Sequence, residues 1–529
     1  KFMRTVIGTN NIDSTARTGY AGAQRFIENI FGQGATANII SGLSNSDLVF
    51  VIGGDPTTVN PILGLQIRAC SRKGANILTA GNIKGLKYFN PLKLQPKLHS
   101  ETVLLEGLVS ALKNKKGLSG SHQKLEAEIK DINVSVEDVE KMCGIGRRVF
   151  MESVEILSEA SAPAIVLGKE TAQSRGGSYK LLLVSAINYL INGRIYLLSG
   201  RANEQGLLDM GCMPDSLPGD RPVALAEFRR RYENEWKTAI PDKPGLSIFE
   251  MVDPAAKGPI KAMYVMGENL VYNLPDSKAM ESALKNIEFL VVQDIFLTET
   301  GRLADVVLPA LSWAEKDGTF TNMERRIQRL RKAVNRDGME DWRIISEVSK
   351  KMEMNFNYRN TEDVFKEITK VSPLYRNLTY EDIEKGDAIY PYKGEPLRNV
   401  TRDIQVHKGN GVVPGKLYVR LERPLFHSGT LSRKAPALMN IYPEAVARVN
   451  TDTARTLSIE NGNIVRVSTK TGSLELPAVI DKEIDGSSVM LTNNFETKGA
   501  FSLMGYSIDP VTGAPCIDNN EVVVEKVKV

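Results

Sequence analysis

Six short apolar runs, each ending near a glycine or a polar residue, constrain the fold of this chain more than any other feature. They are DLVFVIGGDP (47–56), GANILTAG (74–81), APAIVLGKE (162–170), IYLLSGRANEQG (195–206), KAMYVMGEN (261–269) and EFLVVQDIF (288–296). Strands that are buried on both faces of a sheet read as continuous runs of Val, Ile and Leu. Helical patterns, such as those at 99–113 and 136–160, separate the runs. This βα repetition predicts parallel, doubly wound sheets with right-handed crossovers.

The number of βα units predicts two α/β domains, because six units are too many for one small sheet. The length of 529 residues also allows about three domains. We expect a first α/β domain at 1–160 and a second at 161–354, divided by a charged helical stretch. Residues 355–413 are irregular and rich in Pro and Tyr, which predicts a wrapping connection.

The texture changes in the last part of the chain. Runs such as GNIVRVSTKTGSLELPAVIDKEI (462–484) alternate apolar and polar residues and contain Thr-Gly turns. This pattern predicts an antiparallel barrel over 414–529. A short helix capped by Asn450 or Thr451 and a tight turn at Gly462 interrupt it.

Composition excludes several classes of protein. Lys and Arg number 67 against 63 Asp and Glu, which is too balanced for a nucleic-acid-binding protein. The four cysteines (Cys70, Cys143, Cys212, Cys516) form no CxxC pair, so they predict no iron–sulfur or zinc site and are best explained by packing. We find no apolar run of about 18 residues, which argues against insertion into a membrane.

Three strand ends carry glycine beside polar side chains: Gly53-Gly54-Asp55, Gly200-Arg201-Ala202-Asn203 and Gly267-Glu268-Asn269. Ligands of open parallel sheets bind outside the carboxyl ends of the strands, so these ends suit an extended polar ligand such as a nucleotide. The alternative is that each glycine serves only the geometry of a βα turn.

The stretch GTNNIDSTARTGY (8–20) precedes all six runs. Asp13 or Ser14 could cap a helix that begins at Ala16. The stretch contains no common metal ligand and no obvious nucleophile.

A longer segment, QDIFLTETGRLADVVLPALSWAEKDGTFTNMERRIQRLRKAV (293–334), resembles the molybdopterin oxidoreductase family, particularly the large subunits of formate dehydrogenases. KFMRTVIGTNNIDSTAR, VIGGDPTTVNPILGLQIRAC, LLSGRANEQGLLDMG, YVMGEN and LFHSGTLSRKAPAL are similar to that family's segments in the same order. The resemblance covers essentially the whole chain. It implies two α/β domains, one interrupted by the other, and a C-terminal six-stranded barrel.

The resemblance also implies a cleft for two molybdopterin guanine dinucleotides around molybdenum or tungsten. The residues that would line it are Gly54, Asp55, Asn60, Asn203, Gly267, Glu268, Asn269, Asp317, Thr319, Asn322, Thr430 and Arg433. The alternative for EKDGTFTN with Arg325 and Arg326 is an inter-domain clasp. His427, beside SGTLSR, is expected to be a surface or barrel histidine.

This chain departs from the formate dehydrogenase pattern at three positions. With NNID in register, Gly19 stands where that group has a metal-binding Cys or selenocysteine, and Tyr20 stands where it has a catalytic His. Ser199 occupies the position of the substrate-orienting Arg, and Arg201 is displaced from it by two residues. The resemblance therefore implies that the formate dehydrogenase catalytic residues are lost.

Such a loss resembles the large peripheral-arm subunit of NADH:quinone oxidoreductase (complex I), whose C-terminal part is similar to this family. This branch implies a mainly structural subunit, peripheral on the cytoplasmic face of a membrane, with other subunits of an electron-transfer complex as partners. Iron–sulfur clusters would lie only in a region upstream of Lys1. Two alternatives stay open: an active molybdenum or tungsten enzyme with altered metal coordination, and a non-catalytic module that binds a guanine dinucleotide.

Overall fold

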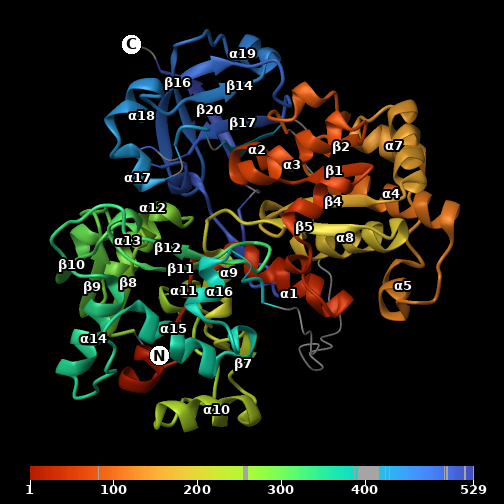
Figure 1. Ribbon diagram of the computed structural model, residues 1–529. Coiled ribbons are helices and arrows are strands. Elements are labelled where there is room, and N and C mark those ends of the chain that lie inside the picture. Colours follow the sequence, from red (N-terminus) through yellow and green to blue (C-terminus); the bar gives the residue numbers. More distant parts are fainter. Residues whose placement is uncertain are drawn as a thin grey trace. The chain divides into compact units, whose positions relative to one another are not determined.

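Five parallel strands form the largest open sheet of the computed structural model, which describes residues 1–81, 83–253, 260–386, 388–390, 416–422, 424–427, 429–493, 495, 499–517 and 520–527. The strands are β1 (Leu48–Ile52), β2 (Asn76–Ala80), β3 (Leu92–Leu94), β4 (Pro163–Gly168) and β5 (Arg194–Leu198), and their spatial order is β3-β2-β1-β4-β5 (Figure 1). The order reverses between β1 and β4. This reversal is the point at which doubly wound sheets bind ligands.

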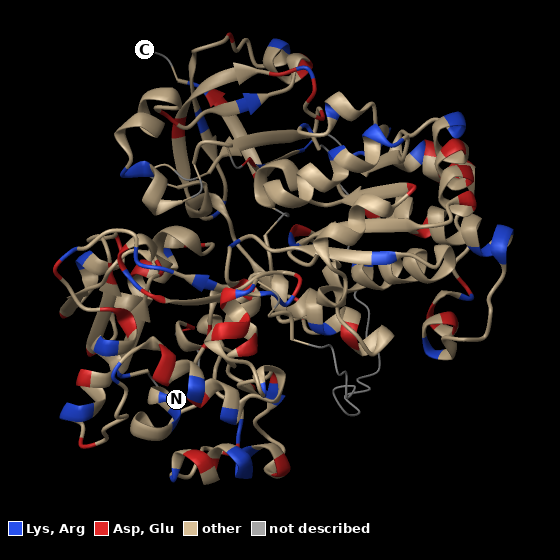
Figure 2. Ribbon diagram, in the orientation of Figure 1, with Lys and Arg blue, Asp and Glu red and all other residues tan. Residues whose placement is uncertain are grey.

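Helices cover both faces of this sheet. On one face, Phe50, Leu78 and Ile165 share a core with α1 (Tyr20–Phe31), α4 (Glu101–Lys116), α7 (Arg147–Glu159) and α8 (Gly177–Ile191). On the other face, α3 (Pro61–Arg72) contacts β1. Charged residues lie on outer helices such as α7, while β1 and β4 carry none (Figure 2). Burial on both faces explains why the strands read as continuous apolar runs.

The sheet crosses the domain boundary that we predicted at 160. Strands β4 and β5 lie beyond that boundary but pair within the first sheet. The charged stretch before them is a crossover connection, in which α5 (Gln123–Ile129) and α6 (Val136–Cys143) join α4 and α7. Its apolar side packs against the sheet's core, so it connects two strands and does not divide two domains.

The chain instead divides into two discontinuous units. The first unit consists of Lys1–Arg17 and Ala202–Lys393, and the second of Thr18–Arg201 and Gly394–Val529. The first unit contains a three-stranded parallel sheet in the order β10-β9-β8. Its strands are β8 (Ala262–Met266), β9 (Phe289–Asp294) and β10 (Val306–Pro309).

Other elements of the first unit surround this sheet along the chain. They are α9 (Glu204–Asp209), β6 (Ser216–Leu217), β7 (Arg221–Pro222), α10 (Ala226–Trp236), α11 (Ile248–Met251), α12 (Leu270–Asn273), α13 (Ser277–Lys285), β11 (Gly318–Thr321), β12 (Ile327–Leu330) and α14 (Asp341–Lys351). The predicted irregular connection at 355–413 holds two further helices, α15 (Thr361–Val371) and α16 (Tyr380–Glu384). Residues 391–413 of that connection lie outside the described residues.

A buried arginine ties the first residues of the chain to the first unit. Arg4 lies in a π-helix, Met3–Ile7, and its Nη2 donates to the carbonyls of Gly211 at 3.1 Å, Met213 at 3.2 Å and Ser216 at 2.5 Å. Its Nε donates to Asn10 Oδ1 at 3.0 Å. Burial lowers the pKa of Arg4 to about 10. These bonds compensate the desolvation of the guanidinium.

A closed six-stranded barrel forms the C-terminal part of the second unit, as the resemblance implied. Two of its strand pairings, β13 with β17 and β14 with β16, are parallel, so the prediction of an antiparallel barrel is wrong at these pairs. Its strands are β13 (Leu417–Glu422), β17 (Ser488–Thr492), β14 (Ala447–Val449), β16 (Ser473–Ile480), β15 (Ile464–Ser468) and β20 (Glu521–Lys526), in this spatial order. The predicted short helix is α19 (Thr451–Thr456), and Asn450 caps it by accepting from Asp452 N at 2.8 Å. The C-terminal part also contains two short helices and a short hairpin. The helices are α17 (Thr430–Arg433) and α18 (Pro436–Ile441), and the hairpin consists of β18 (Ser507–Ile508) and β19 (Pro515–Cys516).

Candidate cofactor site

The segment before the first long helix begins as an irregular turn. Thr15–Arg17 is a single 3₁₀ turn, and α1 begins at Tyr20 and not at the predicted Ala16. Asp13 caps no α-helix: it accepts from Ile248 N at 2.8 Å and forms an ion pair with Arg17. Gly19 occupies the position before α1, with φ at +98°. The helix start is therefore set by the glycine.

Gly19 has no room for a side chain. A Cβ built on it would lie 2.7 Å from the backbone oxygen of Lys169 and 3.0 Å from Cγ of Gln173. Its positive φ also disfavours any residue with a Cβ. The backbone of the loop after β4 thus fills the direction in which a residue at position 19 would extend.

Tyr20 and Ser199 are also enclosed by the second unit. Tyr20 is fully buried in the core that packs under the five-stranded sheet. Ser199 follows β5 and accepts a hydrogen bond from Asn60 Nδ2 at 3.3 Å. Arg201, two residues later, is exposed. The structure thus places a core aromatic ring and a bonded hydroxyl at these two positions.

Gly54 and Asp55 lie after the carboxyl end of β1, as the sequence predicted, and this end is at the strand-order reversal. A Cβ on Gly54 would lie 3.0 Å from Gly168 Cα, so the turns after β1 and β4 approach closely. Asp55 accepts from Thr57 N at 2.9 Å and Gly85 N at 2.7 Å, and it caps the short helix α2 (Pro56–Val59). These contacts give both residues a role in the local chain geometry.

Gly267 lies at the carboxyl end of β8 and has open space around it. Its φ is +61°, and no atom lies within 4 Å of a Cβ built on it. Glu268 accepts from Asn269 N at 3.1 Å. Asn269 donates to Glu299 at 2.5 Å and accepts from Thr300 Oγ1 at 3.0 Å. The bare backbone of Gly267 is therefore the accessible part of this strand end.

Neighbouring carboxylates surround the same strand end. Burial raises the pKa of Asp294, at the end of β9, and the charges of Glu268 and Asp341 add to this effect. Gln293 Nε2 donates to Asp341 Oδ1 at 2.7 Å, and Lys316 forms an ion pair with Asp341. The edge therefore gathers several acceptor oxygens, and the carboxylate of Asp341 is paired with a lysine.

The β11–β12 hairpin holds Thr319 and Asn322, and Asp317 directly precedes it. Asn322 Oδ1 accepts from the backbone N–H groups of Glu324 and Arg326, both at 3.0 Å, and so fixes the turn. Thr319 pairs with Arg329 across the hairpin, and Arg329 lies 3.8 Å from Asp317.

Two further bonds of this hairpin join it to other parts of the first unit. Asn203 Oδ1 accepts from Thr321 N at 2.8 Å. Arg325 donates to Tyr390 O at 2.9 Å. Within the turn itself, Arg326 pairs with Glu324 at 2.8 Å. These contacts show a clasp within one unit, whereas the alternative considered from the sequence was a clasp between domains.

Thr430 and Arg433 lie on α17, directly after Gly429. A Cβ on Gly429 would meet no atom within 4 Å, and Arg433 Nη2 lies 3.4 Å from Thr430 Oγ1. His427 is fully buried, its Nε2 lies 2.8 Å from Tyr442 O, and its ring packs edge-on against Phe495. His427 therefore lies buried between β13 and α17, so the surface alternative is wrong.

Two family models match this chain. One, described as molybdopterin oxidoreductase, matches residues 1–351, and another, described as molydopterin dinucleotide binding domain, matches residues 421–520. The chain belongs to the molybdopterin oxidoreductase family. The resemblance inferred from the sequence motifs is confirmed at this level.

Curated relatives in the family include formate dehydrogenase subunits. The F420-dependent formate dehydrogenase subunit alpha of Methanocaldococcus jannaschii is 32% identical over the whole chain and 83% of that protein. The probable oxidoreductase YjgC of Bacillus subtilis is 30% identical over the whole chain, which spans 57% of that protein. Formate dehydrogenase H of Escherichia coli is 26% identical over 97% of the chain and 78% of that protein.

A solved structure of low sequence identity has the same fold. Acetylene hydratase from Pelobacter acetylenicus aligns with a TM-score of 0.69 and 14% identity, covering 98% of this chain and 86% of that chain. At this identity the likeness concerns the fold alone.

The family's dinucleotide cofactor fits some of the predicted residues and not others. Gly267 and Gly429 leave backbone open beside Glu268, Thr430 and Arg433, which suits phosphates or a guanine edge. Position 19 offers no side chain to a metal, and a carbonyl closes the space beside it. The open backbone at Gly267 and at Gly429 suits this family's dinucleotide cofactor, whereas Gly19, which the resemblance aligned with a metal ligand, has no side chain.

One polar cluster in the first unit was not predicted from the sequence. Asp209 is buried and accepts from Tyr375 OH at 2.8 Å, from Tyr390 OH at 2.9 Å and from Gln205 Nε2 at 2.7 Å. Burial raises the pKa of Asp209 to about 7. The only local signal was the spacing of Gln205 and Asp209, which places them on one face of a helix.

Two features are absent from the described part of the chain. No helix there is long and apolar enough to cross a membrane. Nor do three or more His, Cys, Asp or Glu side chains in that part gather in a way that could hold a metal ion. Of the four free cysteines, Cys70 and Cys143 are buried, as expected for packing residues.

Proposed function

We propose that this chain is a mainly structural subunit of an electron-transfer complex, similar to the large peripheral-arm subunit of NADH:quinone oxidoreductase, and that it does not oxidise formate. The observation that carries the proposal is the closed space at Gly19, where a Cβ would lie 2.7 Å from Lys169 O. A residue at this position cannot reach a metal without moving the loop after β4.

Two further positions support the loss of formate chemistry. Proton transfer needs a titratable group within hydrogen-bond reach of the reacting atoms, and Tyr20 is buried in the apolar core. A carboxylate substrate needs a cation that orients it, whereas Ser199 carries no charge and bonds Asn60. Gly19, Tyr20 and Ser199 therefore stand where a formate dehydrogenase would have its metal ligand, its proton-transferring residue and the cation that binds the carboxylate.

A molybdopterin guanine dinucleotide, if bound, would use the open backbone within either unit. In the first unit we expect Gly267 and Glu268 to contact a phosphate or a guanine, and in the second unit we expect Thr430 and Arg433 on α17 to do so. Bound with its metal, this group supplies two-electron redox chemistry in the family. In the proposed role it would stabilise the fold.

Membership of the proposed complex also implies partner subunits and a location in the cell for this chain. By resemblance, the iron–sulfur clusters would lie in a region upstream of Lys1, and other subunits would contact this chain. The complex would lie on the cytoplasmic face of a membrane, with this chain as a peripheral subunit.

A second candidate function is an active enzyme with altered metal coordination. The observation in its favour is the 32% identity over the whole chain to an F420-dependent formate dehydrogenase subunit alpha. Such an enzyme would bind its metal through pterin groups alone and would act on formate or another small substrate.

Metal analysis of the purified full-length protein distinguishes the candidates. We expect less than about 0.1 Mo or W per chain and no formate-dependent dye reduction, since position 19 supplies no metal ligand. Formate dehydrogenase H serves as the positive control for both assays. Stoichiometric Mo or W with substrate turnover would contradict the structural role, while extracted guanine dinucleotide without metal would favour a non-catalytic dinucleotide-binding module.

A further inference from the structure

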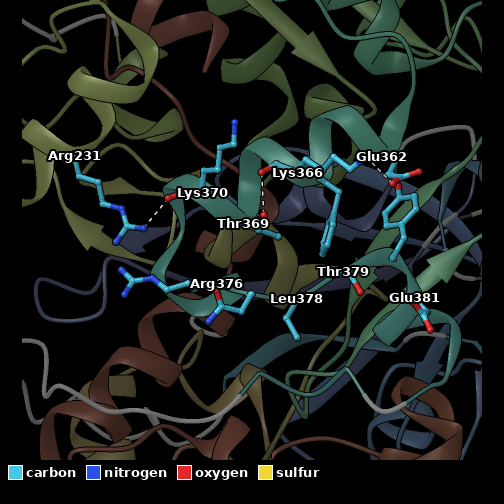
Figure 3. A pocket seen from close by; sticks show the side chains of 12 residues that line it. Arg231, Glu362, Lys366, Thr369, Lys370, Arg376, Leu378, Thr379 and Glu381 are labelled. Atoms are coloured by element: carbon cyan, nitrogen blue, oxygen red, sulfur yellow. Dashed lines mark hydrogen bonds and ion pairs between the residues drawn. The ribbon is translucent and has the colours of Figure 1, made fainter.

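A half-open surface cavity of about 660 Å³, with Arg376 among its exposed lining residues, lies entirely within the first unit, between α15 and the segment that leads into α16 (Figure 3). Small-molecule sites have volumes of about 300–1,000 Å³, so the cavity is large enough for a ligand of modest size. None of the residues considered above for the dinucleotide cofactor lines it.

Four cationic side chains line this cavity: Arg231, Lys366, Lys370 and Arg376. The two carboxylates of the lining are Glu362 and Glu381. Each already has a lysine partner: Glu362 pairs with Lys366 at 2.8 Å and Glu381 with Lys385 at 2.9 Å.

The two arginines are the unmatched charges of the lining. Arg231 Nη2 donates to the carbonyl of Lys370 at 2.6 Å, which holds its guanidinium at the cavity. Among the described residues, no carboxylate lies within ion-pair distance of either guanidinium, and the Arg376 side chain has no hydrogen-bond partner.

The guanidinium groups of Arg231 and Arg376 occupy the same end of the cavity (Figure 3). Burial lowers the pKa of Arg231, and the charge of Arg376 is the next largest cause. Two repelling cations of this kind are stabilised by an anion placed between them. Guanidinium groups match the geometry of phosphate oxygens, which they bind with paired N–H donors.

The rest of the lining suits the uncharged part of a ligand. Leu378 and the half-buried Tyr380 contribute apolar surface, with the buried Phe365 behind them, and Thr369 and Asn377 contribute polar groups. Sites for small molecules typically combine such an apolar wall with a few polar groups that fix orientation.

We propose that this cavity binds a small phosphorylated organic molecule, with its phosphoryl group between Arg231 and Arg376 and its organic part against Leu378 and Tyr380. The proposal concerns a site apart from the cofactor residues. Its outcome is therefore independent of whether the chain is structural or catalytic.

Titration calorimetry of the full chain with adenosine monophosphate tests the site. We expect one-to-one binding with a Kd of about 1 mM or lower at low ionic strength. Arg376→Gln should weaken it about tenfold, because a charge-assisted contact to phosphate is lost. This variant should fold normally, since the Arg376 side chain has no described partner.

The matched control is Arg336→Gln in the same unit. Arg336 is exposed, pairs with Glu315 at 3.4 Å and does not line the cavity, so this variant removes the same charge elsewhere. It should change the Kd by less than about twofold. Adenosine should not bind at the same concentrations. Failure of adenosine monophosphate to saturate the protein, equal binding of adenosine, or an equal effect of Arg336→Gln would each overturn the proposal.

Discussion

Gly19 directly precedes helix α1 and lies where no side chain has room. Its positive φ and the nearby carbonyl of Lys169 together require glycine. Gly32, at the other end of α1, also has a positive φ of +70°, but no atom lies near a Cβ built on it. A comparison of the two glycines therefore distinguishes the cost of a positive φ from the cost of a steric clash, at the two ends of one helix.

We expect Gly19→Ala to destabilise the second unit by about 3 kcal/mol, since overpacking adds to the strain of a positive φ. Gly32→Ala should cost about 1 kcal/mol, because only the strain remains. Urea unfolding followed by circular dichroism measures both. Equal costs for the two variants would mean that the loop after β4 moves freely away from position 19.

Asp209 couples the stability of the first unit to pH. Its pKa in the folded protein is about 7, above the ordinary value of 3.8, so the folded state binds the proton more tightly. The free energy of unfolding should therefore fall as the pH rises from about 4 to 7, by up to roughly 4 kcal/mol. We expect Asp209→Asn to reduce this loss, because the amide stays neutral at every pH.

Urea titrations at pH 5 and pH 8 check this prediction. The variant should exceed the unchanged protein in stability by a clearly larger margin at pH 8 than at pH 5, because the loss runs from about pH 4 to 7. Asp452→Asn, at an exposed position on α19, should leave the pH dependence as it is. If the free energy of unfolding of Asp209→Asn depends on pH as strongly as that of the unchanged protein, the pH dependence belongs to another group.

At the scale of elements, helix α8 receives its cap from a distant loop. Gly176 precedes the helix and offers no side chain, but Asp509 Oδ2 accepts from Ser178 N at 3.2 Å and from Ser178 Oγ at 2.8 Å. Asp509 Oδ1 also accepts from Thr512 N at 2.8 Å. One buried carboxylate thus joins the barrel segment to the α/β sheet of the same unit.

Asp509→Ala should destabilise the second unit by about 2–3 kcal/mol, because it removes a helix cap and leaves buried N–H groups unsatisfied. Asp452→Ala, in the exposed first turn of α19, should cost less than about 0.5 kcal/mol. Thermal unfolding followed at 222 nm compares the two. Similar costs would show that Asp509 does not act as a cap.

The hydrophobic pattern of the sequence predicted the strands better than it predicted which strands share a sheet. All six apolar runs are strands, because burial on both faces imposes a pattern within a few residues. The boundary at 160 was wrong because strand order depends on pairing between distant runs, such as β1 with β4. Helix α15 was missed, since its neighbours rich in Pro and Tyr suggested an irregular chain.

The candidate site could be located from the sequence but its contacts could not. Gly54 and Gly267 lie at strand ends, as expected. The sequence could not show that Asp55 and Asn322 bond backbone N–H groups, because a cap and a ligand use the same side chains. The Asp209 cluster escaped prediction because Tyr375 and Tyr390 lie 166 and 181 residues away.

At the scale of the whole molecule, two discontinuous units should unfold in separable steps. Two-state behaviour is expected of single small domains and not of a chain with two cores. We expect scanning calorimetry to resolve two transitions. Gly19→Ala should lower only that of the second unit, and Asp209→Asn should change only the pH dependence of the other. A single transition shifted by both variants would show that the units unfold together.

The bonds of Arg4 set an order of events for the nascent chain. Its acceptor Gly211 lies 207 residues further along the chain, so at about 5–20 residues per second the ribosome makes the acceptors roughly 10–40 s later. The five-stranded sheet is complete at Leu198, before Gly211 is synthesised. During translation, Arg4 is therefore made well before the carbonyls that it bonds, and its long-range hydrogen bonds can form only after residues 211–216 have been synthesised.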